Sequence, residues 1–376
     1  MSNPDLAMIA DKTLYQIALT FIPGVGAVHA RNLINAVGDE EALFHEKRSN
    51  LKKIPGLSHR LIDEILNPEV LRRAEKELQF IDKHGIKVLF YTQEDYPSRL
   101  TNCIDAPVLL YCKGEVSYNL PKVVSVVGTR NASRYGLEWC RQFVGELSLL
   151  FPDILIVSGL AYGIDICAHR TAVENRVATV AVLAHGLDRI YPALHRKTAE
   201  EMLERGGWVT EFPSDTEPDR YNFVKRNRIV AGMADAVVVV ESGEKGGSII
   251  TAEIANSYFR EVFAVPGRTT DARSTGCNTL IATNRALLLQ NSAAFINQMG
   301  WDGDTKAKQP LQMELFPELN ETEEKVFQLL SKVESMHVNM LSIELNLPVS
   351  DLFFTLLELE MKKVVRALPG GVYKLI

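Results

Sequence analysis

Three stretches between residues 121 and 290 decide the fold of this chain. The first, VVSVVGTR at 123–130, is an apolar run that ends in a glycine and an arginine. The second, ILIVSGLAYGID at 154–165, is an apolar run that ends in a glycine-rich turn. The third, FVKRNR at 223–228, is a basic cluster headed by a phenylalanine. The first two have the form of strand-to-helix turns that hold phosphates, and the third supplies positive charge and an aromatic face.

Apolar, β-branched runs alternate with helical patterns from residue 122 onward. Strands are expected at VVSVV, ILIVSG, ATVAVLAHG, GWVTEF, AVVVVES and REVFAVPG. This alternation predicts an α/β fold, an extended Rossmann-like core whose parallel sheet is covered by helices on both faces. Ligands of such sheets bind beyond the carboxyl ends of the strands. The glycine-rich turns are all expected at that edge: Gly128, Ser158 with Gly159, Gly186, residues 243–248, and Gly267.

Small helical units precede this core, which is expected to span residues 121–300. Within residues 1–68, the segments IPGVG and IPGL each lead into an amphipathic stretch, which is the pattern of a helix-hairpin-helix used twice. In that motif, turn N–H groups face a DNA phosphate. Plain helical hairpins with glycine-containing turns are the alternative. Residues 69–120 are expected to form a linking helix and strands that lead into the core.

A second small unit is expected after the core. Residues 301–318 are polar and contain proline, and they are expected to form a linker. Residues 319–376 have the pattern of three helices and a strand–turn–strand, the layout of a winged helix. The first of these helices opens with Thr-x-x-Lys and not with a strict capping box. The expected recognition helix, SDLFFTLLELEMKK, is acidic and apolar, which favours protein contact or a structural role over reading a DNA groove.

Bulk composition is that of a soluble chain with several domains. Hydrophobic residues make up 46%, charged residues 23%, and the net charge is −6, so nucleic-acid binding requires a local basic patch. Five cysteines without a CxxC pair argue against a metal site or a disulfide framework and fit a reducing cytoplasm. No uncharged run approaches the ~20 residues of a membrane span. No metal, cofactor or membrane is therefore expected.

The turns and the basic cluster supply the candidate site residues. Arg130 predicts a phosphate contact made by side chain and backbone together, with a structural arginine paired to a carboxylate as the alternative. In the cluster, Lys225 and Arg228 share one helical face, and Arg226 is turned about 100° from Lys225. Such a group can follow a sugar-phosphate backbone while Phe223 stacks on a base. A solvated basic face is the alternative.

Two catalytic interpretations have less support. Asp165 and His169 are four residues apart on one helical face and could form an acid/base pair, although a carboxylate that stabilises its own helix is the simpler interpretation. GEKGGS at 243–248 lacks the Gly-Lys-Ser/Thr ending of a P-loop, which argues against NTP hydrolysis.

Five segments together resemble the DNA-processing protein A (DprA, also called Smf) family over about residues 85–295. They are GTRNASRYG, SGLAYGIDICAH, FVKRNRIVAG, GGSIITAEIA and PGRTTDARSTGCNTLI, in this order and spacing. Thr129 stands where the family usually has serine, and Val224 where it has proline.

The resemblance implies a protein that is not an enzyme. It implies binding of single-stranded DNA, a homodimer, protection of incoming DNA during natural transformation, and transfer of that DNA to the RecA recombinase. The family's pocket carries over to Arg130 and to Lys225, Arg226 and Arg228. With the positions expected at the strand ends, the candidate nucleic-acid site comprises Gly128, Arg130, Ser158, Gly159, Phe223, Lys225, Arg226, Asn227, Arg228, Gly247, Ser248 and Asn278.

Two other functions remain open at this stage. Nucleoside-monophosphate phosphoribohydrolases share glycine-rich strand ends and carry PGGxGTxxE, whose glutamate acts at the N-glycosidic bond. GEKGGSIITAE keeps glycines and Glu253 but not that pattern. A scaffold without affinity for nucleic acid is the third possibility.

Overall fold

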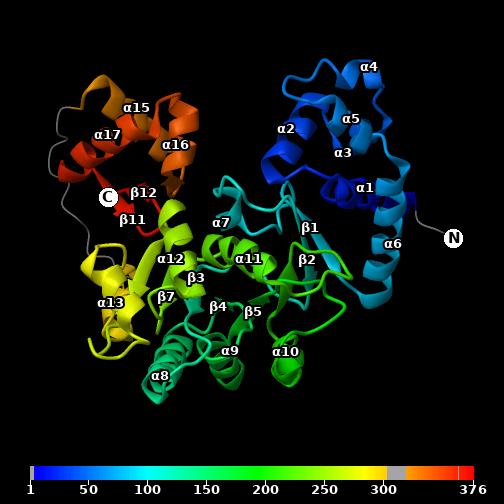
Figure 1. Cartoon of the computed structure of the whole chain (residues 1–376). Coiled ribbons are helices and arrows are strands. Elements are labelled where there is room, and N and C mark those ends of the chain that lie inside the picture. The colour runs from blue at the N-terminus through cyan, green and yellow to red at the C-terminus, as the bar shows by residue number, and fades with distance from the viewer. Residues whose placement is uncertain (1–3, 303–318, 363) are drawn as a thin grey trace.

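The computed structural model describes residues 4–302, 319–362 and 364–376 (Figure 1). The segment expected as a linker, residues 301–318, lies outside the described residues except for its first two positions.

A nine-stranded sheet lies at the centre of the molecule, in the order β1-β2-β6-β5-β4-β3-β7-β8-β9. All neighbouring strands from β6 to β9 are parallel. This confirms the Rossmann-like α/β core, since each predicted run forms a strand. The strands are β1 (Lys87–Phe90), β2 (Leu109–Lys113), β3 (Lys122–Val127), β4 (Ile154–Ser158), β5 (Ala178–Val182), β6 (Gly207–Thr210), β7 (Ala236–Val239), β8 (Glu261–Ala264) and β9 (Leu287–Leu288).

Residues 69–120 contain two strands, as expected, but the sequence did not predict that these strands join the sheet of the core. β2 pairs with β6, and β1 with β2, both antiparallel. Four of the five β2 residues are buried, so the strand belongs to the interior of the sheet. Short apolar runs such as LLYCK do not reveal strand direction, because burial on both faces removes the alternating pattern.

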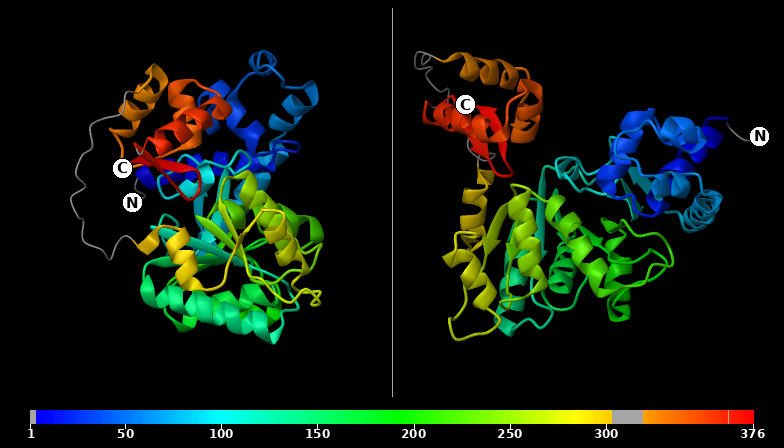
Figure 2. Two further views of the ribbon diagram at one scale, coloured as in Figure 1. Left: turned by 90° about the vertical axis from the view of Figure 1, so that its left-hand side faces the viewer. Right: turned by 45° about the horizontal axis from the view of Figure 1, so that its top comes forward.

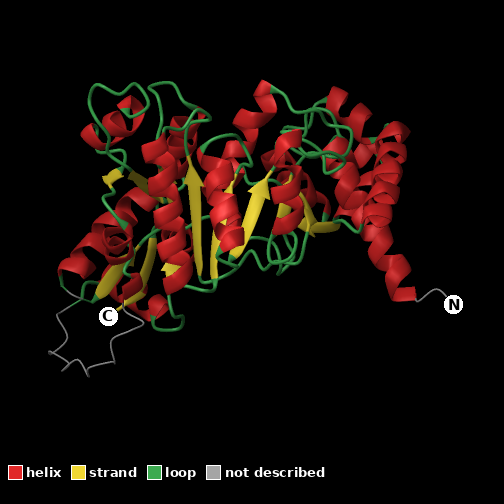
Figure 3. Ribbon diagram, turned by 90° about the horizontal axis from the view of Figure 1, so that it is seen from below, coloured by secondary structure: helices red, strands yellow, loops and turns green. Residues whose placement is uncertain are grey.

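Helices cover both faces of the sheet, as Figure 3 shows. One core contains side chains from α11, α12 and α13, and another contains side chains from α8, α9 and α14. The core helices are α7 (Ser98–Thr101), α8 (Arg134–Leu150), α9 (Ile164–Glu174), α10 (Arg196–Met202), α11 (Arg220–Gly232), α12 (Gly247–Ser257), α13 (Thr275–Ala282) and α14 (Ser292–Gln298), with a 3₁₀ turn at Ala193–His195.

The N-terminal helices include two pairs that are each joined by a short turn, α1 with α2 and α4 with α5. Gly24 and Gly56 lie in the turns with φ of +84° and +80°, a region that glycine enters without a steric penalty. The side chains of these helices share a core with α10 and the β5–β6 part of the sheet. The helices are α1 (Pro4–Phe21), α2 (Ala27–Val37), α3 (Glu40–His45), α4 (Arg48–Leu51), α5 (His59–Ile65) and α6 (Pro68–His84).

The C-terminal residues form a winged helix with its own core, as predicted. It contains α15 (Glu321–Leu330), α16 (Val338–Leu345), α17 (Val349–Met361), and a sheet of β10 (Met336–His337), β12 (Val372–Leu375) and β11 (Val365–Leu368). Its helix α17 approaches the core at Phe259, whose ring centroid lies 6.0 Å from that of Phe353. Figure 2 shows this unit beside the core.

The prediction that α15 lacks a capping box was wrong. Asn320 accepts hydrogen bonds from the backbone N–H of Thr322 and Glu323, and the Glu323 side chain accepts the Asn320 N–H. The capping box begins at Asn320, one residue before the ETEE segment, so a prediction that starts from Thr322 misses it.

No single helix among the described residues is long and apolar enough to cross a membrane, whereas α16 and α17, bent by 110°, pass on length and composition as a pair. In the same residues, no group of three or more His, Cys, Asp and Glu is placed to hold a metal ion. The five cysteines are buried and unpaired.

Candidate nucleic-acid interface

A cavity of about 760 Å³ opens at the carboxyl ends of β3 and β7. The chain leaves β3 toward β4 on one side and leaves β7 toward β8 on the other, so this is the switch point at which such sheets bind ligands. Eight of the predicted site residues line the cavity: Gly128, Arg130, Gly159, Phe223, Arg226, Asn227, Gly247 and Ser248.

The turn after β3 is held by Glu241, a buried residue two positions after the end of β7. The Thr129 N–H donates to the Glu241 carbonyl at 2.7 Å. The Glu241 carboxylate accepts the Ser133 N–H at 2.8 Å and the Ser133 hydroxyl at 2.5 Å. Glu241 thereby fixes the loop that carries Arg130. The sequence analysis did not single out Glu241, although a carboxylate that follows a buried strand at this edge was a usable signal.

Arg226 forms the floor of the cavity. Its side chain is 4% exposed and donates from Nη1 to the Val182 carbonyl at 2.7 Å. A Cβ on Gly159 would lie 1.8 Å from that nitrogen, so only glycine leaves room for the guanidinium. Burial lowers the pKa of Arg226 to about 10, and the charge of Asp165 offsets part of this effect.

Asp165 is the buried counter-charge of Arg226. Its carboxylate accepts the Gly159 N–H at 3.2 Å. Burial raises the pKa of Asp165 more than the positive charge of Arg226 lowers it. Desolvation shifts the pKa of both groups toward the neutral form, and the charge of each group offsets part of this shift in the other.

Two guanidinium groups surround the Phe223 ring. Cζ of Arg130 lies 5.0 Å from the ring centroid and that of Arg226 lies 6.0 Å away. Arg130 is exposed, so its charge faces solvent above the cavity. The cation–π contact holds this flexible side chain at the rim, where a phosphate can reach it.

The first turn of α12 forms another wall of the cavity. Its N-cap residue is Gly246, which has no side chain that could accept a hydrogen bond from the backbone N–H groups of this turn. Asn227 donates from Nδ2 to the Gly247 carbonyl at 3.4 Å and so connects α11 to this turn. Backbone N–H groups and the helix dipole at such an end favour an anion. Lys245 lines the same rim and is exposed.

Lys225 and Arg228 lie outside the cavity. They share one helical face, as predicted, but that face contacts Glu211, at 3.1 Å from Lys225 and 2.6 Å from Arg228. This face lines a separate groove of about 400 Å³ beside the first residues of α2. The side chain of Arg228 is 11% exposed and that of Lys225 is 43% exposed. Of the two, Lys225 is the more accessible to a polyanion.

Ser158 and Asn278 are also absent from the cavity lining. Ser158 is fully buried and its hydroxyl donates to the Val126 carbonyl at 2.6 Å. Asn278 pairs with the backbone of Gly267, accepting its N–H at 3.1 Å and donating to its carbonyl at 3.0 Å. Ser158 therefore links the ends of β4 and β3, and Asn278 holds the turn that follows β8.

The residues of the two catalytic alternatives, the Asp165–His169 pair and Glu253, have other partners in the structure. His169 is buried and its Nδ1 lies 2.7 Å from the Thr179 hydroxyl, whereas Asp165 interacts with Gly159 and Arg226. Burial lowers the pKa of His169 to about 3. Glu253 is exposed, lies outside the cavity lining, and forms an ion pair with Arg285 at 2.8 Å.

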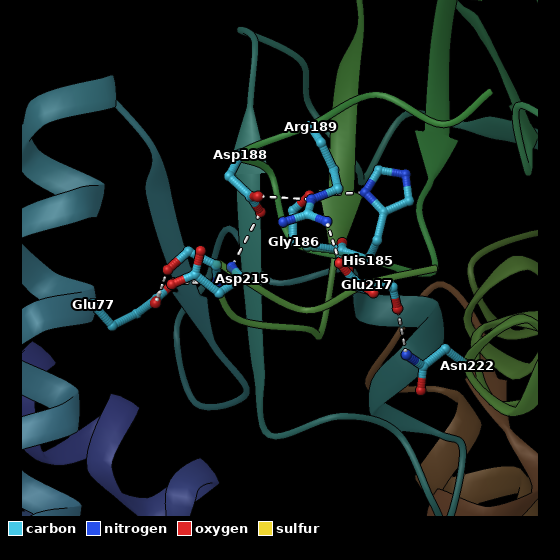
Figure 4. Close-up of polar contacts among 10 residues, drawn as sticks. Glu77, His185, Gly186, Asp188, Arg189, Asp215, Glu217 and Asn222 are labelled. Carbon is cyan, nitrogen blue, oxygen red and sulfur yellow. Dashed lines mark hydrogen bonds and ion pairs between the residues drawn. The ribbon is translucent and has the colours of Figure 1, made fainter. Parts of the chain in front are cut away.

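Two loops beside the cavity brace each other, as Figure 4 shows. The carboxylate of Asp188 accepts from Arg189 Nε at 2.8 Å and from the Asp215 N–H at 3.2 Å. Arg189 also reaches Glu217 at 3.4 Å, and the Gly186 N–H donates to the Thr216 carbonyl at 3.1 Å. The loop after β5 is therefore fixed against the loop that leads into α11.

The second loop is also attached to the N-terminal helices. Glu77 of α6 accepts the Ser214 N–H at 2.9 Å and its hydroxyl at 2.5 Å. At the start of α11, Asp219 caps the helix by accepting the Asn222 N–H at 2.9 Å. These contacts connect α6 to the helix that carries Phe223 and Arg226.

Comparison with known proteins agrees with this geometry. Residues 87–300 match the family model described as DNA recombination-mediator protein A, and residues 311–371 match that of the DprA winged helix domain. The chain is 34% identical over 310 residues to Protein Smf of Escherichia coli K12, which covers 81% of each chain. It is 38% identical over 229 residues to DNA processing protein DprA of Streptococcus pneumoniae, covering 59% of this chain and 79% of that protein.

Solved structures show the same architecture. DprA from Streptococcus pneumoniae matches with a TM-score of 0.57 and 29% identity, over 73% of this chain and 98% of that one. DNA processing protein A from Helicobacter pylori, described for its binding of single-stranded DNA, matches with a TM-score of 0.52 and 29% identity, over 58% and 96%. The predicted fold class and family resemblance are confirmed.

Proposed function

The chain belongs to the DNA recombination-mediator protein A family, and we propose that it binds single-stranded DNA in the cavity between β3, α11 and α12. The proposal rests foremost on one observation, the convergence of Arg130, the buried Arg226 and the open N-terminus of α12 on that cavity. These groups suit phosphates and carry no base preference. Glu253 does not line this cavity, so we assign no catalytic role to it.

We base the proposed biological role on membership of this family. The bound strand is incoming DNA, protected and then transferred to the RecA recombinase during natural transformation, by a homodimer in the cytoplasm. Residues 1–68 act as a helix-hairpin-helix-like domain, residues 69–120 connect it to the core at 121–300, and residues 319–376 act as the winged-helix domain. The acidic recognition helix α17 suits a protein contact better than a DNA groove.

Competition binding tests the central part of this proposal. A labelled single-stranded oligonucleotide is bound to the full chain and displaced with unlabelled single- or double-stranded DNA of the same sequence. We expect the single strand to compete more strongly and Arg130→Ala to weaken binding. Equal competition by duplex, or no retardation of the single strand at low salt, would contradict the proposal.

A further inference from the structure

We propose that Tyr191, which the sequence analysis did not select, is the side chain on which a DNA base stacks in the cavity. This inference rests on the proposed binding of single-stranded DNA, and it assigns the base contact to the loop after β5 instead of to α11.

Phe223 is poorly placed for the stacking role that its position in the sequence suggested. The exposed guanidinium of Arg130 lies over its ring, with Cζ at 5.0 Å from the centroid, and Arg226 approaches it from the cavity floor. A base that stacked on Phe223 would have to displace Arg130, which is the charge best placed to hold a phosphate. Phe223 therefore serves as the platform for the two arginines.

Tyr191 offers the open aromatic surface that Phe223 lacks. It lines the same cavity and is 44% exposed. Its ring centroid lies 6.0 Å from that of Phe223, with an angle of 49° between the planes. A nucleotide that enters the cavity can thus place its phosphate at Arg130 and its base on Tyr191 at the same time.

The loop that carries Tyr191 is fixed at both ends, so the ring is held in position before DNA arrives. On one side, Asp188 and Gly186 bond to the loop that precedes α11 (Figure 4). On the other side, His195 is 2% exposed and its Nδ1 donates to the Leu160 carbonyl at 2.8 Å. A pre-positioned ring loses little conformational entropy on binding, which favours affinity.

Tyr221 provides a matched control. It is more exposed than Tyr191, at 76%, but it lies outside the cavity lining. It is placed four residues before Lys225 and seven before Arg228, so it shares the α11 face that looks toward Glu211. Removal of its ring changes aromatic exposure without changing the cavity.

The test separates base contacts from phosphate contacts. Fluorescence anisotropy measures affinity for labelled oligo-dT and for an abasic oligonucleotide of the same length, with wild type, Tyr191→Ala, Tyr191→Phe and Tyr221→Ala. Thermal melts followed by circular dichroism check that each variant is folded. Stacking energies of about 1–3 kcal/mol per base correspond to about a 5- to 140-fold change in affinity.

We expect Tyr191→Ala to lose at least about 5-fold affinity for oligo-dT while its affinity for the abasic strand stays unchanged. Tyr191→Phe and Tyr221→Ala should behave as wild type. Tight binding of oligo-dT by wild type together with an insensitive Tyr191→Ala, or an equal loss on both probes, overturns this inference alone. Failure of wild type to bind either strand overturns the proposed function, and the inference with it.

Discussion

Replacement of Glu241 by alanine should destabilise the core and loosen the turn that carries Arg130. Glu241 is 1% exposed, and its carboxylate accepts hydrogen bonds from the Ser133 N–H and hydroxyl at 2.8 and 2.5 Å. A hydrogen bond to a charged group contributes about 1.5–3 kcal/mol, so the loss of two should cost at least about 3 kcal/mol. That is a large part of the ~5–15 kcal/mol that stabilises a typical domain.

Urea unfolding measures this cost, with Glu241→Gln and Glu253→Ala alongside. The glutamine retains one acceptor of the same shape, so about 1–2 kcal/mol should be lost. Glu253 pairs with Arg285 at the surface, with side chains 51% and 41% exposed, so its removal should cost no more than about 1 kcal/mol. If Glu241→Ala unfolds at the same urea concentration as Glu253→Ala, the assignment of Glu241 as the holder of this turn is incorrect.

Three further changes have defined outcomes. Gly159→Ala places a methyl group 1.8 Å from Arg226 Nη1, so urea unfolding should show a loss of about 1–3 kcal/mol, and DNA affinity should fall; an unchanged midpoint would contradict the tight contact. His169 has its pKa lowered to about 3, so the unfolded chain, with a pKa near 6.5, binds a proton that the folded chain does not. Stability present above pH 6.5 should therefore be lost as pH falls toward 3, by about 1.4 kcal/mol from this group between pH 7.5 and 5.5, and unfolding of His169→Gln should show a pH dependence smaller by that amount. Lys225→Ala should weaken binding of single-stranded DNA less than Arg130→Ala in anisotropy titrations, because the lysine lies outside the cavity beside Glu211; the reverse order would move the site to the groove beside α2.

The sheet was predictable because its determinants are local. Runs such as VVSVV and ILIVS are apolar, β-branched and closed by glycine, and the helices between them have their own periodicity. Parallel pairing then brings the turns to one edge, which places Gly128 and Gly247 around one cavity.

The composition of the site depended on contacts distant in sequence. Helical spacing correctly separated Arg226 from Lys225 and Arg228, but it did not reveal which face of α11 looks into the cavity. That choice depends on Glu211, which draws Lys225 and Arg228 to the other side. Glu241 bonds to Ser133, 108 positions away, and no short-range pattern indicates such a pair.

Tyr191 was missed for a similar reason. Its loop has no glycine-rich or basic motif at that position, and only the bracing between two loops brings its ring to Phe223. Phe223 in turn appeared suited to stacking because the basic cluster follows it directly, whereas its ring is covered by an arginine from a different strand end.

The most direct measurement is the affinity for a single-stranded oligonucleotide as a function of salt, for wild type and Arg130→Ala. The account predicts that wild-type affinity falls steadily with salt, and that Arg130→Ala binds all sequences more weakly with a slope of log affinity against log salt that is shallower by about 0.7. Salt-independent binding by wild type, or an Arg130→Ala variant that matches it at every salt concentration, would contradict the assignment of this cavity as a phosphate-binding site.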